Sequence, residues 1–176
     1  MRHDPSVAEC LYDRVAIDGL LDTQAAILNE RYAGACPLVL CVMTGAVVYA
    51  GHLLPRLKFS LDLDYVHASR YGDERTGGAL NWLVRPRKPV RDRDVLLLDD
   101  ILDEGVTLNE IAQWLKAEGA RSVEIAVLTH KEKSKPQPCE PNYPALKTPD
   151  QYVYGFGLDV DGLWRNANGI FVATPA

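Results

Sequence analysis

Apolar runs and amphipathic segments alternate along the first part of the chain. Between residues 18 and 32 most apolar side chains recur at helical spacing, which predicts an amphipathic helix that Gly34 ends. Residues 37–43 (PLVLCVM) form a short run rich in β-formers and predict a strand buried on both faces. After a turn at 44–46, residues 47–54 predict a second helix.

The pattern then changes to strict alternation. Residues 59–67 predict a strand with one wet face. Its apolar face would hold Phe59, Leu61, Leu63 and Tyr65, and its polar face Ser60, Asp62 and Asp64. Residues 68–81 are polar and contain glycine, and a loop of that length is uncommon unless it is mobile or functional. Residues 82–85 predict a partner strand, and the basic stretch 85–94 a solvated connection.

The second half of the chain predicts a parallel sheet. Val95–Leu98 is a further buried strand, and residues 123–128 predict the next one. The helix between them would end near Gly119, and its apolar face consists of Leu108, Ile111, Ala112 and Leu115. Strand, helix and strand form a βαβ unit, which requires parallel strands.

The C-terminal part is less regular. Residues 132–151 are rich in proline and predict a loop. From Gln151 onward alternation returns, and it places Tyr152, Tyr154 and Phe156 on one face of a strand.

Composition and charge narrow the class of protein. With 176 residues, 47% of them hydrophobic, we expect one domain over residues 1–176. The net charge of −5 offers no basic footprint for nucleic acid. No apolar run approaches the roughly 20 residues that span a membrane, and the first ten residues lack the apolar core of a signal peptide.

The cysteines and histidines do not suggest a metal centre. Cys10, Cys36, Cys41 and Cys139 form no CxxC pair, and the four histidines are scattered. We therefore expect reduced thiols and a cytoplasmic protein.

The most unusual stretch follows the strand at Val95–Leu98. Asp99, Asp100, Asp103 and Glu104 place four carboxylates within six residues, immediately before the helix. Gly105 allows close approach of the backbone, and a helix start offers unpaired amides that attract anions. A phosphorylated sugar suits this mixture, with phosphate on the amides and ribose hydroxyls on Asp99 and Asp100. A divalent metal would offset the negative charge, and Asp103 is left for proton transfer.

Other interpretations of this stretch are weaker. A Walker loop would need GxxxxGK[ST], and a dinucleotide site would need GxGxxG after a strand; neither string occurs. An aspartyl-phosphate phosphatase would use Asp-x-Asp, whereas Asp99 and Asp100 are adjacent. The acids could also simply cap a helix and face water, but the buried strand before them and the Gly-x-Thr after them favour a site.

These residues resemble a known family. LLLDDILDEGVTL (96–108) resembles the phosphoribosyl pyrophosphate signature of type I phosphoribosyltransferases. Over most of its length the chain resembles the hypoxanthine-guanine phosphoribosyltransferases. Four further stretches carry that likeness: CVMTGAVVYAGHLL (41–54), ASRYGD (68–73), VLTHK (127–131) and YVYGFGLDVDGLWRN (152–166).

The resemblance implies a fold and a reaction. The fold would be α/β, a central mostly parallel sheet flanked by helices, with a small hood and a flexible catalytic loop. A purine would displace pyrophosphate from phosphoribosyl pyrophosphate through an oxocarbenium-like transition state, with Mg²⁺ neutralising the leaving group. The family also suggests a homodimer or homotetramer.

The resemblance also implies residue roles. Asp99 and Asp100 would hold the ribose hydroxyls directly or through magnesium, Asp159 would help bind the metal, and Asp103 would exchange a proton with the purine. The remaining contacts with the substrates would be made by Glu104, Gly105, Val106 and Thr107 (ribose phosphate), Thr44, Gly45 and Arg165 (pyrophosphate), Lys131, Tyr152 and Val153 (purine), and Ser69 and Tyr71 (the loop over the site). The family often has a cis peptide before the position of Thr44.

Each assignment has a plainer rival. Lys131 could be a solvated charge and Tyr152 a core residue. Asp159 could only start a turn, Arg165 could rest on a neighbouring aromatic ring, and the loop with Ser69 and Tyr71 could be ordinary. Lys131 should favour 6-oxopurines over adenine, but hypoxanthine, guanine and xanthine are not separated.

Two positions depart from the family pattern. Thr44 stands where the family often has lysine, and Glu104 where it usually has Thr or Ser. The first should weaken pyrophosphate binding, and the second requires that Glu104 point outward. Both leave room for an alternative, a catalytically weak or inactive paralogue that regulates by binding nucleotides.

Overall fold

The computed structural model describes residues 3–70 and 80–173. The side chains of Ser69, Arg70 and Leu80 are outside that description, although their backbone belongs to strands. Tyr71, which was predicted to belong to the loop over the site, lies outside the described residues.

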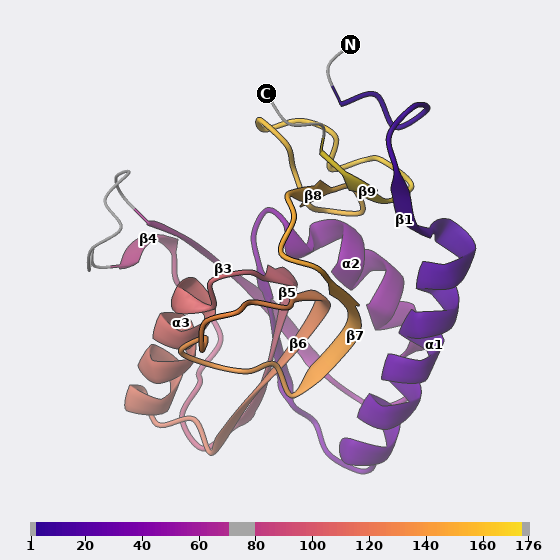
Figure 1. Cartoon of the computed structure of the whole chain (residues 1–176). Coiled ribbons are helices and arrows are strands. Elements are labelled where there is room, and N and C mark those ends of the chain that lie inside the picture. The colour runs from indigo at the N-terminus through magenta and orange to yellow at the C-terminus, as the bar shows by residue number, and fades with distance from the viewer. Residues whose placement is uncertain (1–2, 71–79, 174–176) are drawn as a thin grey trace.

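A six-stranded sheet forms the centre of the molecule (Figure 1). Its strands, in spatial order, are β4 (Leu80–Val84), β3 (Asp62–Arg70), β2 (Leu38–Val42), β5 (Asp94–Leu102), β6 (Ser122–Lys131) and β7 (Tyr143–Thr148). All neighbours run parallel except β3 and β4, which are antiparallel. The predicted mostly parallel sheet is therefore confirmed.

Helices cover both faces of this sheet (Figure 1). α1 (Arg14–Arg31) and α2 (Ala46–Leu53), with the short 3-10 helix η1 (Leu54–Arg56), lie on one face, and α3 (Val106–Ala117) lies on the other. Alternate residues of the inner strands divide between two cores. Val39, Leu96 and Ala126 pack with α1 and α2, whereas Leu38, Leu97 and Val127 pack with α3. Burial on both faces explains why these strands are continuous apolar runs.

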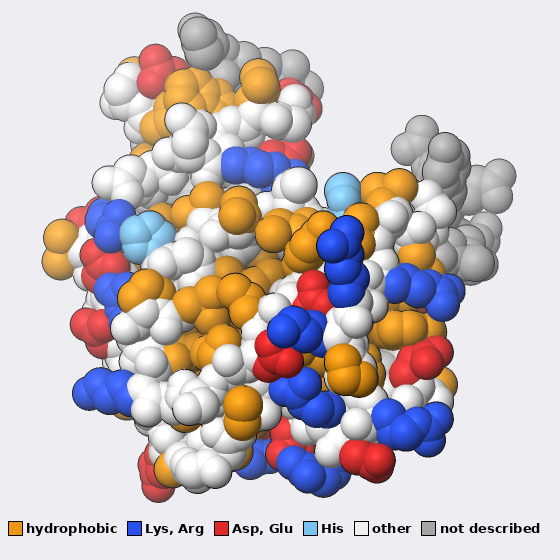
Figure 2. Space-filling model, turned by 180° about the vertical axis from the view of Figure 1, so that it is seen from behind, with side chains coloured by type: hydrophobic (Ala, Val, Ile, Leu, Met, Phe, Trp, Pro, Cys, Tyr) orange, Lys and Arg blue, Asp and Glu red, His pale blue; other side chains and the backbone are white. Residues whose placement is uncertain are grey.

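A small antiparallel sheet forms a second layer beside α1 and α2. It contains β1 (Cys10–Asp13), β9 (Gly169–Val172) and β8 (Val153–Tyr154), in that order. Figure 1 places it above the main sheet, and Figure 2 shows it from behind as a lobe set off from the body. Phe156, Leu158 and Ile170 from this part belong to the same core as α1 and α2, which ties the two sheets together.

Buried polar contacts also fix the layers. Gln24 of α1 is 3% exposed, and its Nε2 donates to the carbonyls of Val127 at 3.1 Å and Tyr143 at 2.7 Å. Its Oε1 accepts from Tyr49 Oη of α2 at 2.9 Å. One side chain thus joins two helices to the strands β6 and β7.

Most of the predicted elements are present, with shifted ends. α1 begins at Arg14 rather than Asp18, because Asp13 caps it by accepting a hydrogen bond from the Ala16 amide at 2.8 Å. β5 continues to Leu102, so Asp99 and Asp100 lie within the strand rather than after it. In the described part of the chain, no helix has the length and hydropathy needed to cross a bilayer.

Three local predictions were wrong. Residues 132–151 are not all loop, because β7 pairs with β6 and includes Pro144. An edge strand tolerates a proline whose missing amide faces outward.

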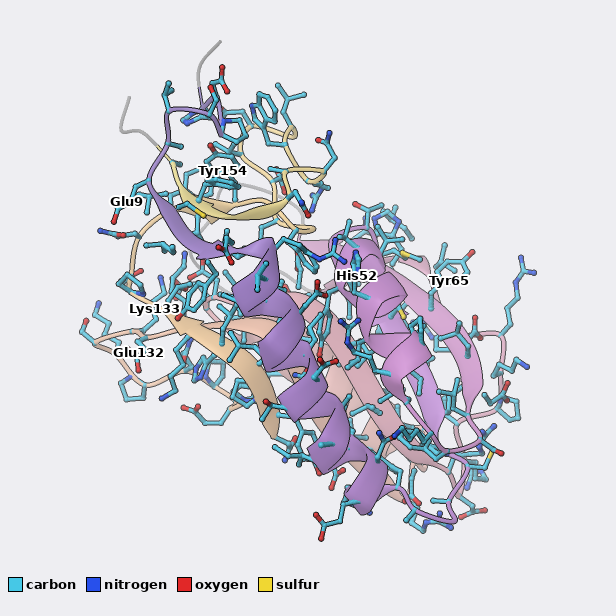
Figure 3. All side chains as sticks on the ribbon, turned by 90° about the vertical axis from the view of Figure 1, so that its right-hand side faces the viewer. Glu9, His52, Tyr65, Glu132, Lys133 and Tyr154 are labelled. Carbon is cyan, nitrogen blue, oxygen red and sulfur yellow. The ribbon has the colours of Figure 1, made fainter. Side chains whose placement is uncertain are left out.

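In β3, Leu63 and Tyr65 are 47% and 37% exposed, because α2 does not cover this strand. Tyr65 lies at the margin of the molecule in Figure 3.

The third error concerns the segment after Gln151. Tyr152 is 55% exposed, whereas Tyr154 and Phe156 are buried. Gly155 and Phe156 have φ values of 100° and 53°, so the chain turns and does not continue as a strand. Tyr152 is therefore not a core residue.

Candidate active site

A cavity of about 540 Å³ opens at the carboxyl ends of β2, β5 and β6. This is where parallel sheets bind their ligands. Nearly all the predicted site residues line it: Thr44, Gly45, Asp99, Asp100, Asp103, Glu104, Gly105, Val106, Thr107, Lys131, Tyr152, Val153, Asp159 and Arg165. Sequence positions more than 120 residues apart are thus brought to one place. Tyr71 and the side chain of Ser69 lie outside the described residues.

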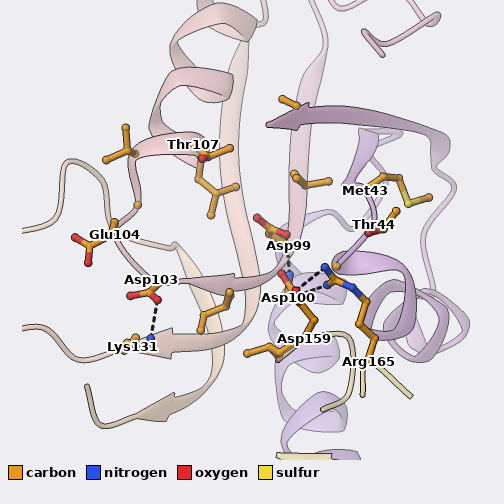
Figure 4. A pocket seen from close by; sticks show the side chains of 18 of the residues that line it. Met43, Thr44, Asp99, Asp100, Asp103, Glu104, Thr107, Lys131, Asp159 and Arg165 are labelled. Carbon is orange, nitrogen blue, oxygen red and sulfur yellow. Dashed lines mark hydrogen bonds and ion pairs between the residues drawn. The ribbon is translucent and has the colours of Figure 1, made fainter. Parts of the chain in front are cut away.

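An acidic pair occupies the centre of the cavity, on β5 (Figure 4). Burial, and then the charge of neighbouring Asp100, raise the pKa of Asp99 well above its usual range. Burial also raises the pKa of Asp100, although the Arg165 guanidinium opposes this. Two carboxylates this close and this buried favour a cation or hydroxyl donors between them.

Arg165 connects the acidic pair to the C-terminal segment. Its Nη2 lies 2.5 Å from Asp159 Oδ1, and its Nη1 lies 3.8 Å from Asp100 Oδ2. Nη1 also donates to the Gly157 carbonyl at 2.7 Å. The other Asp159 oxygen accepts from the Gly162 amide at 2.9 Å. Asp159 therefore starts a turn, as the plainer interpretation expected, and also lines the cavity, while its metal role stays a prediction.

A second charged group lies at the other side of the cavity (Figure 4). Lys131 Nζ lies 2.6 Å from Asp103 Oδ2, and Lys133 Nζ lies 2.8 Å from Asp103 Oδ1. Burial alone would raise the pKa of Asp103, but the hydrogen bond from Lys131 and the ion pair with Lys133 hold it below its usual value. Asp103 is thus ionised at neutral pH and can accept a proton.

The turn between these acids and α3 can bind an anion. Gly105 caps α3 with a φ of 75°, and no side chain caps the helix. The amides of the first turn are therefore available to a ligand, and the Thr107 hydroxyl stands among them. Glu104 is 71% exposed and its carboxylate lies 3.0 Å from Lys133 Nζ.

A tight turn after β2 forms the wall opposite α3. The peptide bond between Met43 and Thr44 is cis, as the resemblance implied. A Cβ on Gly45 would collide with the Asp100 carboxylate, so glycine lets this carboxylate keep its position. Gly157, with a φ of 113°, in turn allows the C-terminal segment to approach the Gly45 carbonyl. The only sign of this close approach in the sequence is the pair of glycines in GFG (155–157).

Tyr152 and Val153 form the far end of the cavity. Tyr152 lines it with its ring more than half exposed, so that ring is available to a flat ligand. Val153 follows it in β8, with its side chain buried.

Sequence reasoning missed several residues around the site. Val42, Met43, His67, Ala68, Ile101, Leu108 and Leu158 also line the cavity. Lys133 and Gln137 contact Asp103 from outside it. Both lie in the charged, proline-rich stretch that was expected to be a solvated loop, and no spacing in the sequence indicates their partners.

Comparisons with known proteins agree with this geometry. The family described as "Phosphoribosyl transferase domain" matches residues 11–161. The hypoxanthine-guanine phosphoribosyltransferase of Lactococcus lactis subsp. lactis (strain IL1403) is 31% identical over 150 residues, which are 85% of this chain and 81% of the relative.

Solved structures show the same fold. A hypoxanthine phosphoribosyltransferase from Staphylococcus aureus is 28% identical with a TM-score of 0.90, over 95% of this chain and 91% of that one. A Trypanosoma cruzi hypoxanthine phosphoribosyltransferase, solved as a mutant in a ternary substrates complex, is 26% identical with a TM-score of 0.89, over 97% of both chains. The chain belongs to the phosphoribosyltransferase domain family and, within it, to the hypoxanthine-guanine phosphoribosyltransferases.

Proposed function

We propose that the protein is a purine-salvage enzyme that converts hypoxanthine, guanine or both, with phosphoribosyl pyrophosphate, to IMP or GMP and pyrophosphate. The observation that supports this most is the convergence of an acidic pair, a proton acceptor and an uncapped helix start in the cavity at the ends of β2, β5 and β6. The Trypanosoma cruzi relative, which is named a hypoxanthine phosphoribosyltransferase and was solved in a ternary substrates complex, supports the same type of reaction.

The turn at 104–107 would hold the ribose phosphate. Its amides and the Thr107 hydroxyl donate hydrogen bonds, and the positive end of α3 attracts the anion. Thr44 and Gly45 would offer backbone amides to pyrophosphate from the opposite wall. Arg165 would contact pyrophosphate by exchanging its present contact with Asp100 or Asp159.

Asp99 and Asp100 would orient the ribose hydroxyls and stabilise positive charge that develops on the sugar. Preorganised charge of this kind is the largest contribution in many enzymes. Substrate hydroxyls would also offset the burial that raises the pKa of both aspartates, and the repulsion from Asp100 that adds to it at Asp99.

Mg²⁺ fits this donor set. Within residues 3–70 and 80–173 there is no group of three or more His, Cys, Asp or Glu arranged to hold a metal alone. Mg²⁺ commonly uses one or two carboxylates and completes its shell with substrate oxygens and water. Asp99 and Asp100 would hold the ion. Asp159 would become a third ligand if its Oδ1 left Arg165 and bound the ion instead. When bound, the ion would neutralise the leaving pyrophosphate.

The purine would lie between Tyr152 and the Asp103–Lys131 pair. Tyr152 would stack on the base, and the Val153 backbone would contact its edge. Asp103, ionised because of its lysines, would take the proton from the purine imidazole nitrogen. Lys131 would donate to the exocyclic oxygen, which favours 6-oxopurines. Ser69 and Tyr71 would close the site from the segment after β3.

We also expect a cytoplasmic enzyme that assembles as a homodimer or homotetramer. All four cysteines are free thiols, which suits a reducing compartment. Hydrophobic side chains gather in the middle of the face shown in Figure 2. Val47, Leu63 and Tyr65 are among the exposed large hydrophobic residues, which a second copy could cover.

A steady-state assay tests the function. The purified protein is mixed with phosphoribosyl pyrophosphate and Mg²⁺, and with hypoxanthine, guanine, xanthine or adenine in turn. We expect nucleotide formation from the oxo-purines and little from adenine. No turnover with any base, in a folded protein, would contradict the proposal and favour a nucleotide-binding regulator.

A further inference from the structure

The segment between β6 and β7 packs against the turn that precedes α3. Gln137 donates from Nε2 to the Asp103 carbonyl, and its Oε1 lies 2.9 Å from His130 Nε2. Two residues further, the Cys139 thiol donates to the Gly105 carbonyl at 3.3 Å. These contacts fix the backbone of the turn, and neither Gln137 nor Cys139 lines the cavity.

Lys133 adds charge to this contact. Its Nζ lies 2.8 Å from Asp103 Oδ1, 3.0 Å from Glu104 Oε1 and 2.8 Å from Asp150 Oδ1. Its side chain is only 15% exposed, and Figure 3 shows it beside Glu132 near β7. Burial lowers the pKa of Lys133, but the three carboxylates beside its ammonium outweigh this and raise the pKa. The ammonium is therefore a permanent positive charge beside the turn.

The positive charge of Lys133 matters for the phosphate site because of Glu104. Its amide belongs to the turn proposed to hold the ribose phosphate, and its carboxylate would repel a phosphate if it turned inward. In Figure 4 the Glu104 side chain points away from Asp99, Asp100 and Thr107. Lys133 is the cation that it contacts there, at 3.0 Å.

We propose that Lys133 is a positioning residue for phosphate binding, which holds the Glu104 carboxylate outside the phosphate site and neutralises it. The inference rests on the proposed function, because it requires that the turn at 104–107 binds the phosphate of the nucleotide. It predicts that Lys133 affects ligands that carry a 5′-phosphate and acts through Glu104.

The test compares IMP with inosine, which lacks the phosphate. Dissociation constants of both are measured by titration calorimetry or competition, and the ratio of inosine to IMP gives the contribution of the phosphate. Any effect of Lys133 on the purine, through Asp103, cancels in this ratio. The variants are Lys133→Gln, Glu104→Gln and the double variant. Lys147→Gln is the matched control, because Lys147 also pairs with a glutamate but is 61% exposed.

We expect Lys133→Gln to reduce the ratio by about tenfold, the scale of one unpaired charge near an anion site. Glu104→Gln in the same chain should restore it to within about threefold of the original protein. Lys147→Gln should leave the ratio unchanged. Lys133→Arg, which keeps the charge, should lower it less than Lys133→Gln does.

Two outcomes would overturn the inference. If the ratio measured for the double variant stays as low as the ratio for Lys133→Gln, Lys133 does not act through Glu104. If Lys133→Gln folds normally by circular dichroism and keeps the original ratio, the charge is not needed. Failure of the unchanged protein to bind IMP at all would instead overturn the proposed function and this inference with it.

Discussion

The Lys131 ammonium lies 2.6 Å from Asp103 Oδ2, and this contact joins the carboxyl ends of β5 and β6. Lys131 is only 5% exposed, and a buried lysine requires a carboxylate partner. The sequence assigned the two residues separately, one to the purine oxygen and one to the purine nitrogen. The structure holds them as a pair on the wall of the cavity.

Replacing Asp103 should separate turnover from binding. Asp103→Asn keeps the shape but cannot accept a proton, so we expect kcat to fall by about 10²–10⁴-fold. The KM for phosphoribosyl pyrophosphate should change by less than about threefold, because none of the contacts proposed for that substrate uses the Asp103 side chain. Steady-state formation of IMP measures both constants. Unchanged turnover would remove Asp103 from the proton-transfer role.

Gly45 should tolerate no side chain. In Gly45→Ala the new Cβ meets the Asp100 carboxylate and must displace it. We expect activity to fall by about 10²-fold or more, since misplacement by about 1 Å has effects of this size. Gly51→Ala is the control, because a Cβ there has no atom within 4 Å and alanine favours the helix. Equal activity of the two variants would show that Asp100 has room to move.

Asp99 should destabilise the ligand-free protein at neutral pH. Its pKa is raised in the folded state by burial and by Asp100, so keeping it ionised costs folding free energy. We expect Asp99→Asn to raise the unfolding free energy at pH 7.5 without Mg²⁺ while activity is lost. The gain should shrink as the pH falls through the raised pKa, because the aspartate then becomes neutral as well.

Urea unfolding of both proteins at pH 7.5 and pH 5 measures this difference. An asparagine variant that is less stable than the original at pH 7.5 would mean that the ionised Asp99 is satisfied by its surroundings.

The sequence predicted the elements whose pattern is local. The doubly buried strand β2 is an uninterrupted apolar run, and the apolar face of α3 recurs at helical spacing, so both were found. The acidic stretch after Val95 combined an apolar strand with a helix start, and its residues do meet in one cavity.

The wrong predictions concern residues whose structure is determined by tertiary contacts. Pro144 suggested a loop, but an edge strand accommodates it. The alternation in β3 suggested a buried face for Leu63, yet coverage depends on where α2 lies. Lys133 lies among other charges in the sequence, and its partners come from two other segments of the chain. A one-dimensional pattern contains no information on such partners.

Gln24 should contribute more to stability than its polarity suggests. Gln24→Leu would leave the Tyr49 hydroxyl and the Val127 and Tyr143 carbonyls without these partners. Each unsatisfied buried group costs about 1–3 kcal/mol, so we expect a loss of about 2–4 kcal/mol after relaxation. Gln113→Leu on α3 is the matched control, since that side chain is exposed. Equal unfolding free energies in urea would contradict the prediction.

Asp94 and Arg121 should make stability depend on pH at the acidic end. Arg121 donates to both Asp94 oxygens, and Ser122 donates at 2.7 Å, so the pKa of Asp94 falls to about 2. A carboxyl with a lowered pKa stabilises the fold above its unfolded value of about 3.9, and this stability is lost as the pH falls toward 2.

Arg121 is 65% exposed, so solvent screens the pair and we expect only a small contribution to stability at pH 7. Asp94→Asn should be less stable than the original by this amount at pH 7 and pH 5, and by less at pH 3. Asp22→Asn, which disrupts a pair whose carboxylate is 68% exposed, should change little at any of these values. Urea unfolding at the three pH values gives the differences in unfolding free energy. If the difference between the original protein and Asp94→Asn grows as the pH falls, the predicted direction of the pH dependence is wrong.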